Sequence, residues 1–214
     1  MVDNTICTCN FTCSSLFCLS VGLVQRIISC GGCDLISLAL RSHSTCDDII
    51  IWACRTLCNC ILTLDAVNVQ DRTLCQDKLA QQQVPQVLIG VFAERIGNLR
   101  KLAAQWALNG IGCLSRRHDG NMHLFVELGV CELLHSVKQQ FSFDDEKVAE
   151  SICWVIGNVS YPVEEAQARW GACGACEVVL TALRKHVNNE ETVQGKYVCM
   201  YLCMNLCMYV CMYV

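Results

Sequence analysis

Apolar residues recur along much of the chain at three- and four-residue steps, which is the spacing of one face of an α-helix. The clearest case lies in residues 148–159, where the apolar positions are Val148, Ile152, Val155, Ile156 and Val159. A looser version runs from Leu99 to Leu114. The chain has only two prolines, so long stretches are free to be helical. The pattern predicts an all-α protein.

Two short signatures recur and alternate along the chain. One is a small residue, a cysteine, an acid and an apolar run, as in Gly32–Ile36, Val130–Leu134 and Ala175–Val179. The other centres on a tryptophan, at Trp52, Trp106 and Trp154. Cys131 and Cys176 lie 45 residues apart, and Trp106 and Trp154 lie 48 apart. A period near 45 is typical of helical armadillo and HEAT repeats.

The spacing is longer in the first half of the chain, where Trp52 and Trp106 lie 54 residues apart. The missing copy of the cysteine signature is predicted at Val84–Leu88, 46 residues before Cys131. An insertion within residues 64–83, which contain a run of three glutamines, would account for the extra length. Glycines at 129 and 174 are predicted to separate one helix from the next.

The unit resembles an armadillo repeat, which has a short first helix, a second helix and a long third helix. Residues 122–160 carry the resemblance best, with helices expected at Met122–Leu128, Gly129–Gln140 and Asp144–Ser160. The resemblance covers roughly Leu16–Gln194 and implies a right-handed α-solenoid of three-helix repeats, with a HEAT-like solenoid as the nearest alternative. We therefore divide the chain into a poorly defined N-terminus (1–15), a repeat domain (16–195) and a tail (196–214).

The repeat domain is expected to hold about four units, the first degenerate and the last truncated. Solenoids need polar capping units at their ends to cover the apolar faces of the terminal repeats. With the first unit degenerate and the last truncated, the array is expected to be uncapped. We therefore expect a fragment of a longer array that self-associates through its uncapped ends.

The tail follows a different pattern, in which Tyr-Val-Cys-Met recurs every four residues, with cysteines at 199, 203, 207 and 211. Such a repeat is what a four-nucleotide unit, TATG, encodes, and Gly195-Lys196-Tyr197 can be encoded by a splice-donor sequence. We interpret residues 196–214 as a non-native extension translated from an intron. The alternative is a membrane anchor, because residues 197–214 are uncharged and long enough to span a bilayer.

The resemblance also implies a function and a candidate site. Armadillo proteins similar to importin-α line a groove with a tryptophan and, four residues later, an asparagine, which hold an extended peptide. Trp154 and Asn158 match this spacing, whereas Asn109 lies three residues after Trp106. The resemblance therefore implies a protein-interaction scaffold with a protein or peptide partner of open identity. Its candidate groove residues are Trp52, Trp106, Asn109, Trp154 and Asn158; the alternative is that the tryptophans pack in the core.

Charge and motifs narrow the function further. The net charge is −4, from 16 Lys and Arg against 20 Asp and Glu, and no basic stripe is present. A nucleic-acid partner is therefore not expected. No phosphate-binding glycine loop, nucleophile elbow or dinucleotide fingerprint occurs. We predict a protein that is not an enzyme and needs no cofactor.

Twenty cysteines stand out, eleven of them in residues 1–75. Many occupy helix positions that suit a small buried side chain, such as Cys54, Cys113 and Cys153. The start of the chain lacks the basic region of a signal peptide, so we expect an intracellular, reducing setting in the cytoplasm or nucleus. Two CxxC pairs, at 30/33 and 173/176, fall on the same phase of the repeat, too far apart to share a zinc ion. We predict no metal site; the alternative is a cysteine-rich metal-binding or redox protein.

Overall fold

The computed structural model describes residues 20–141, 145–160 and 164–185, which form helices joined by short turns. No β-strand occurs within these ranges. The helices described are α1 (Val21–Ser29), α2 (Gly32–Ser42), α3 (Asp47–Asp65), α4 (Val69–Gln81), α5 (Val84–Arg95), α6 (Lys101–Ser115), α7 (Asp119–Glu127), α8 (Val130–Phe141), α9 (Glu146–Ser160), α10 (Glu164–Ala172) and α11 (Ala175–Lys185).

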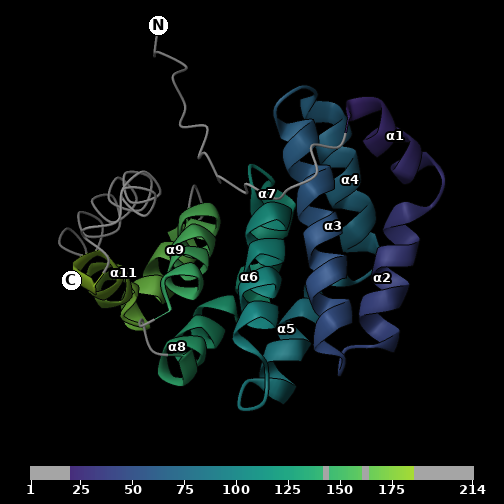
Figure 1. The fold of residues 1–214 in the computed structure, drawn as a ribbon. Coiled ribbons are helices and arrows are strands. Elements are labelled where there is room, and N and C mark those ends of the chain that lie inside the picture. Colours follow the sequence, from purple (N-terminus) through teal and green to yellow (C-terminus); the bar gives the residue numbers. More distant parts are fainter. Residues whose placement is uncertain (1–19, 142–144, 161–163, 186–214) are drawn as a thin grey trace, which may run out of the picture.

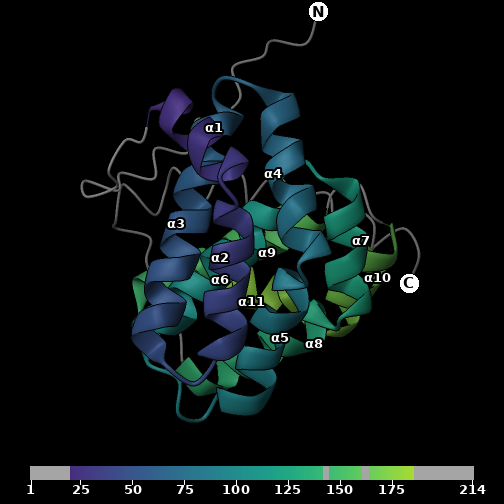
Figure 2. The same cartoon turned by 90° about the vertical axis from the view of Figure 1, so that its right-hand side faces the viewer.

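The helices follow one another in threes. The units are α1–α3, α4–α6 and α7–α9, and α10 and α11 are the first two helices of a fourth. The third helices α3, α6 and α9 stand side by side in Figure 1. Seen from the N-terminal end in Figure 2, α4, α7 and α10 lie along the opposite side from α3. The predicted all-α solenoid is therefore confirmed, and its units are helix triplets rather than the helix pairs of a HEAT array.

The helices expected between residues 122 and 160 are also confirmed. Their observed bounds are those of α7, α8 and α9, and each predicted end lies within three residues of the observed one. The predicted second helix of the earlier unit, at Val84–Leu88, is the start of α5. The cysteine signature, or its counterpart at Val84–Leu88 in the second unit, thus marks the beginning of the second helix.

Residues 64–83, where the insertion is predicted, hold α4, the first helix of the second unit. The extra length of this part of the chain comes from longer helices. The third helix α3 has 19 residues against 15 in α6, and α4 has 13 against 9 in α7. An apolar stripe could not reveal α4, because its buried face includes Arg72 and Gln76.

A left-handed residue separates the first and second helices of every unit. Gly31, Gly129 and Gly174 have φ values of 80°, 82° and 70°. A residue with a Cβ is strained in this conformation, which favours glycine. The second unit breaks the rule, because Gln83 adopts φ 63° at the same place. The turn geometry is thus set by the packing of the helices, and three of the four units use the residue that suits it.

Replacing Gln83 by glycine is therefore expected to stabilise the protein. Relief of the left-handed strain outweighs the added freedom of the unfolded chain, for a net gain of about 0.5–1 kcal/mol. Urea unfolding followed by circular dichroism measures the change. Gly129→Ala is the control and should destabilise, because it introduces the same strain. A Gln83→Gly protein that is less stable than the wild type would contradict the prediction.

The core runs through the middle of the array and is centred on α6. Nearly all of this helix is buried, with Lys101, Leu102 and Gln105 as the exceptions. It packs against α3 on one side and α9 on the other. A central third helix thus has neighbours on both flanks, as expected inside a solenoid.

No single helix in the described ranges is both long enough and apolar enough to span a bilayer. The pair α1 and α2 reaches that length and composition together, but the two helices are bent by 69° relative to each other. The tail at 196–214, and with it the predicted extension or anchor, lies outside the described residues, as does the predicted N-terminal segment 1–15.

Candidate interaction face on the third helices

The C-terminal ends of the third helices define which positions of α3, α6 and α9 are equivalent. Ser115 and Ser160 lie 45 residues apart, both are buried, and each hydroxyl donates to the carbonyl four residues earlier in its helix. The first and second units correspond at a spacing of 50 residues. Asn68 and His118 are both N-caps of the next helix, and each side chain accepts backbone N–H groups there. Equivalent positions on α3, α6 and α9 follow from these two spacings.

In this register the three tryptophans are not equivalent. Trp52 corresponds to Leu102 of α6, and Trp154 corresponds to Asn109. Trp106 falls between these two levels. Each tryptophan thus lies about one helical turn further along its helix than the one before. The tryptophan signature does not mark a single repeated position, and its spacings of 54 and 48 residues differ from the repeat spacings for that reason.

The first tryptophan is exposed and takes part in a cation–π cluster. Trp52 is 61% exposed, whereas Trp106 is 9% exposed. The Cζ atom of Arg55 lies over both rings, 5.2 Å from the centroid of Trp52 and 5.5 Å from that of Trp106. Such distances are within the range at which an indole face attracts a guanidinium. Arg55 therefore joins an exposed indole on α3 to a buried one on α6.

The third tryptophan is a packing residue. Trp154 is 8% exposed, and its ring rests on Gly112 of α6. A Cβ added to Gly112 would lie 2.5 Å from Cε3 of Trp154 and 2.8 Å from Cζ3. Only a glycine leaves room for the indole there. The contact joins α6 to α9, so Trp154 packs these two third helices against each other.

The two candidate asparagines also differ in burial and in hydrogen bonding. Asn109 is 2% exposed, and neither atom of its amide has a hydrogen-bond partner within the described residues. Asn158 is half-buried, and its Nδ2 donates to the carbonyl of Trp154 at 2.8 Å. The five predicted side chains therefore do not form one exposed row. Trp52 lies on the surface, Asn158 lies partly below it, and Trp106, Asn109 and Trp154 are buried.

Polar side chains from α4 hold the C-terminal end of α6. The Nε2 of Gln76 donates to the carbonyls of Cys113 at 2.9 Å, Leu114 at 3.2 Å and Arg116 at 3.0 Å. The last carbonyls of a helix have no partner within the helix. A buried side chain from a neighbouring helix thus adds a hydrogen bond to each of these carbonyls. The carbonyl of Cys113 also accepts from the backbone N–H of Arg116, and that of Leu114 from Nδ2 of Asn121.

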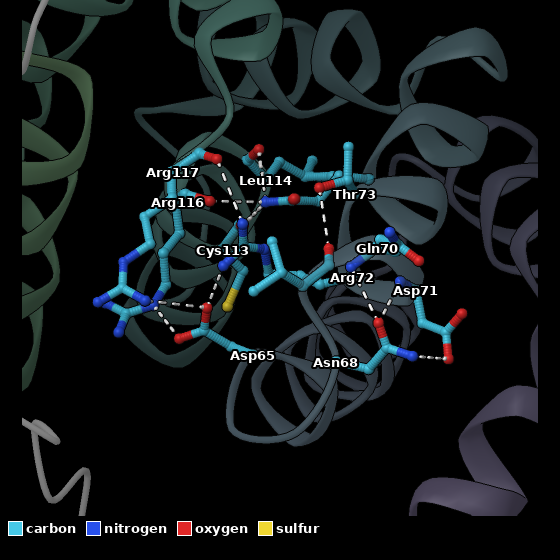
Figure 3. Close-up of polar contacts among 12 residues, drawn as sticks. Asp65, Asn68, Gln70, Asp71, Arg72, Thr73, Cys113, Leu114, Arg116 and Arg117 are labelled. Atoms are coloured by element: carbon cyan, nitrogen blue, oxygen red, sulfur yellow. Dashed lines mark hydrogen bonds and ion pairs between the residues drawn. The ribbon is translucent and has the colours of Figure 1, made fainter.

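A carboxylate at the end of α3 extends this network (Figure 3). Asp65 accepts hydrogen bonds from Arg72 and, at 2.8 Å, from the Nε of Arg116. Burial acts to raise the pKa of Asp65, but the hydrogen bonds and charges of the two arginines outweigh it and hold the pKa below its ordinary value. The end of α3 is therefore pinned to the end of α6 by an ionised carboxylate.

A second carboxylate pins the opposite ends of the same two helices. Asp47, at the start of α3, accepts from Arg95 at 2.8 Å and from the Nε of Arg100 at 2.9 Å. Burial raises the pKa of Asp47, and hydrogen bonds from the two arginines lower it by more, so the net shift is downward. The α3–α6 pair is thus fixed at both ends, which holds the surface between them in one arrangement.

The described cysteines are free thiols and are mostly buried. Burial raises the pKa of Cys60 to about 11 and that of Cys131 to about 12, so both are neutral thiols at neutral pH. No group of three or more His, Cys, Asp or Glu in the described ranges is arranged to hold a metal ion. Of the CxxC pairs, Cys30 is exposed beside buried Cys33; the side chain of Cys176 lies outside the described residues.

Sequence reasoning missed two residues of this surface, Arg55 and Leu102. Leu102 is 50% exposed at the position on α6 that corresponds to Trp52. One signal was present in the sequence: Arg55 follows Trp52 by three residues, so both must lie on one side of a helix. The partner of Arg55 on α6 could not be found this way, because it depends on the register between the helices.

The fold has relatives among solved structures. A designed armadillo repeat protein in complex with the peptide (KR)4 is similar at a TM-score of 0.54, with 14% identity over 87% of each chain. Two engineered proteins solved by the Northeast Structural Genomics Consortium have TM-scores of 0.58 and 0.57, each at 13% identity. They cover 88% and 89% of this chain, and 87% of each of their own chains is matched.

No family model matches the chain, and no curated protein matches it either. Identities this low show the fold alone. The triplet units, the left-handed turn between first and second helices, and the likeness over most of the chain agree on one architecture. The protein has an armadillo-type repeat fold.

Proposed function

We propose that the protein is a non-catalytic interaction scaffold whose third helices α3, α6 and α9 bind an extended segment of a partner protein. The observation that carries the proposal is the pair Trp52 and Leu102. These large apolar side chains are 61% and 50% exposed at corresponding positions of neighbouring third helices. Exposed apolar residues grouped on one face favour an interaction site, and tryptophan is enriched among residues that dominate binding.

The structural relatives support the class of partner. The designed armadillo protein was solved with a peptide, (KR)4. A rigid row of helices suits a peptide, because an extended chain can cross several repeats in succession. The two pinned ends of the α3–α6 pair supply that rigidity here. The proposed setting is the cytoplasm or nucleus, where buried free cysteines stay reduced.

Peptide selection tests the proposal. A library of displayed random peptides is panned against the full chain, and the affinities of selected peptides are measured by fluorescence polarisation. We expect Trp52→Ala to weaken binding at least tenfold, because its exposed indole supplies the apolar contact. Leu74→Ala is the matched control, since Leu74 is 48% exposed but lies on α4. Selected peptides that bind Trp52→Ala as well as the wild type would contradict the proposal.

The N-terminal end of the array supports self-association as a second property. Leu35 and Leu38 lie one turn apart on α2 and are 66% and 53% exposed, and Leu23 of α1 is 46% exposed. We expect the wild type to form concentration-dependent oligomers and Leu35→Glu/Leu38→Glu to shift them toward monomer. Sedimentation velocity measures the shift. A wild type that stays monomeric at the highest concentration reached would argue against this property.

A further inference from the structure

Three arginines surround the carboxylate of Asp65 at the ends of α3 and α6 (Figure 3). Arg72 and the Nε of Arg116 donate hydrogen bonds to it, whereas the Nη1 of Arg117 lies 3.8 Å from its Oδ1. One negative charge thus faces three positive charges, and its hydrogen bonds go to the first two arginines. The side chain of Arg117 is left with a long ion pair and no hydrogen bond within the described residues.

The terminal N–H donors of two of these arginines are unfilled. The side chain of Arg117 is 45% exposed, so solvent reaches its guanidinium directly. Arg116 is 17% exposed, and within the described residues it donates from its Nε alone, which leaves both terminal nitrogens without a hydrogen bond. Both guanidinium groups contact the same carboxylate, as Figure 3 shows. An anion beside them can therefore accept hydrogen bonds from both.

The paired arginines are not a requirement of the turn between α6 and α7. At the equivalent turn one unit earlier, Ala66 and Val67 occupy the places of Arg116 and Arg117. Arg117 also adopts φ 50°, a conformation that strains any residue with a Cβ and suits glycine better. Neither the repeat nor the local backbone accounts for these two side chains.

Neighbouring acids do not neutralise the exposed arginine. The carboxylate of Asp71 is bound by two side-chain amides instead. Asp77 pairs with His118, at 3.0 Å between Oδ1 and Nε2. Asp119 begins α7 and forms no ion pair within the described residues. The positive charge of Arg117 thus has only its long ion pair as a close negative partner.

We propose that Arg116 and Arg117 form a binding site for a phosphate dianion, which is either free or carried on a phosphorylated serine or threonine of a partner. The terminal nitrogens of each guanidinium offer two parallel N–H donors, and a phosphomonoester has three terminal oxygens to accept them. A carboxylate has two oxygens and one charge, too few to satisfy both groups. Asp65 stays in the network and holds Arg116 in place.

This site is separate from the proposed peptide-binding face. Trp52 lies 13 residues before Asp65 on the same helix, which is about 20 Å along its axis. The inference therefore goes beyond the proposed function and does not depend on it.

Isothermal titration calorimetry with the full chain tests the site. The probes are inorganic phosphate, a terminally blocked tripeptide with phosphoserine between two alanines, and matched tripeptides with serine or glutamate in the middle. We expect at least one phosphate probe to bind, at least tenfold more tightly than the glutamate peptide, because it makes further charge-assisted hydrogen bonds. Tighter binding of the phosphopeptide assigns the site to a phosphorylated protein, and tighter binding of inorganic phosphate assigns it to the free ion.

Arg117→Gly is the decisive variant, because glycine suits φ 50° and removes the guanidinium without straining the turn. It should weaken phosphate binding at least tenfold, while the urea midpoint stays the same or rises. Arg117→Lys keeps the charge but loses the paired donors, so it should recover only part of the affinity. Arg41→Gln is the matched control, an exposed arginine at the end of α2, and should bind phosphate as the wild type does.

Three results would overturn the inference. Failure of both phosphate probes to bind would do so, as would equal affinity for the glutamate peptide, or phosphate affinity that survives in Arg117→Gly. Trp52→Ala should bind phosphate as the wild type does, because the two sites are separate. Loss of selected peptides in Trp52→Ala and loss of phosphate in Arg117→Gly therefore report on the proposed function and on this site independently.

Discussion

Replacing Trp154 by alanine is expected to lower the free energy of unfolding by about 3–5 kcal/mol, the usual effect of truncating a buried tryptophan. The side chain is 8% exposed and fills the space between α9 and Gly112 of α6. Its loss leaves a cavity at the contact between two units. Urea unfolding followed by circular dichroism measures the change, and a loss this large is a substantial fraction of the stability of a typical domain.

Trp52→Ala is the matched control, since it removes the same side chain from a 61% exposed position. It gives up chiefly the cation–π contact with Arg55, so the expected loss is about 0.5–1 kcal/mol. Equal effects of the two substitutions would contradict the assignment of Trp154 to the core and of Trp52 to the surface.

The same contact can be tested from its other side. Gly112→Ala places a methyl group against the indole of Trp154 and is expected to destabilise by about 1–3 kcal/mol. In a Trp154→Ala background the clash disappears, so the same substitution should become neutral or stabilising. Gly90→Ala, whose added Cβ meets nothing within 4 Å, should stabilise in either background. A Gly112→Ala effect that is unchanged by Trp154→Ala would place the strain elsewhere.

The difference in burial between Trp154 and Trp52 decides which residue should be mutated to probe the interaction face. Trp154 and Asn158 keep the Trp–Asn spacing of groove-forming armadillo proteins, which makes Trp154 the obvious residue to mutate. A Trp154→Ala protein that loses a partner would report unfolding as much as lost contact. Trp52 is the better probe, because it is 61% exposed and a loss of binding there reflects the face itself.

The fold could be predicted from the sequence because its signals are local. The cysteine signature marks a turn, a helix start and an acid near the first turn, and Glu132 and Glu177 stand three residues after a left-handed glycine. The apolar periodicity of α9 likewise depends only on nearby residues. The helix α4 could not be predicted in this way, because it is a polar helix. Its buried side chains Arg72 and Gln76 bind carbonyls far along the chain.

The site was less predictable because it depends on how helices line up. The sequence places a tryptophan on each third helix, but whether the three share a level is decided by the ends of the helices. The correspondence of those ends follows from Ser115, Ser160 and the N-caps Asn68 and His118. None of these residues belongs to the tryptophan signature. The contact between Arg55 and Trp106 could not be predicted for the same reason, because it depends on how α3 and α6 line up. Packing between units is thus the step that local patterns do not encode.

Replacing Asp65 by alanine is expected to lower the free energy of unfolding by about 3–5 kcal/mol, the range for breaking a buried ion pair. Its carboxylate and the Arg72 guanidinium are 10% and 3% exposed. Without Asp65, Arg72 remains buried and keeps only its long hydrogen bond to the carbonyl of Arg117 at 3.4 Å as a described partner. Asp48→Ala is the control: Asp48 pairs with Arg100, but both side chains are mostly exposed, so the change in stability should be small.

The pH dependence of the stability lost in Asp65→Ala tests whether burial or the arginines dominate the pKa of Asp65. Because the arginines hold its pKa below the ordinary value near 3.9, the unfolded chain takes up the proton first as pH falls. The difference in stability between wild type and Asp65→Ala should therefore be constant from about pH 7 to about pH 5. It should shrink only as pH falls through about 4 toward the folded pKa. If burial outweighed the arginines, the folded pKa would lie above the ordinary value and the ionised form would be disfavoured by folding. The difference would then grow as pH falls through the folded pKa, and urea unfolding at a series of pH values distinguishes the two.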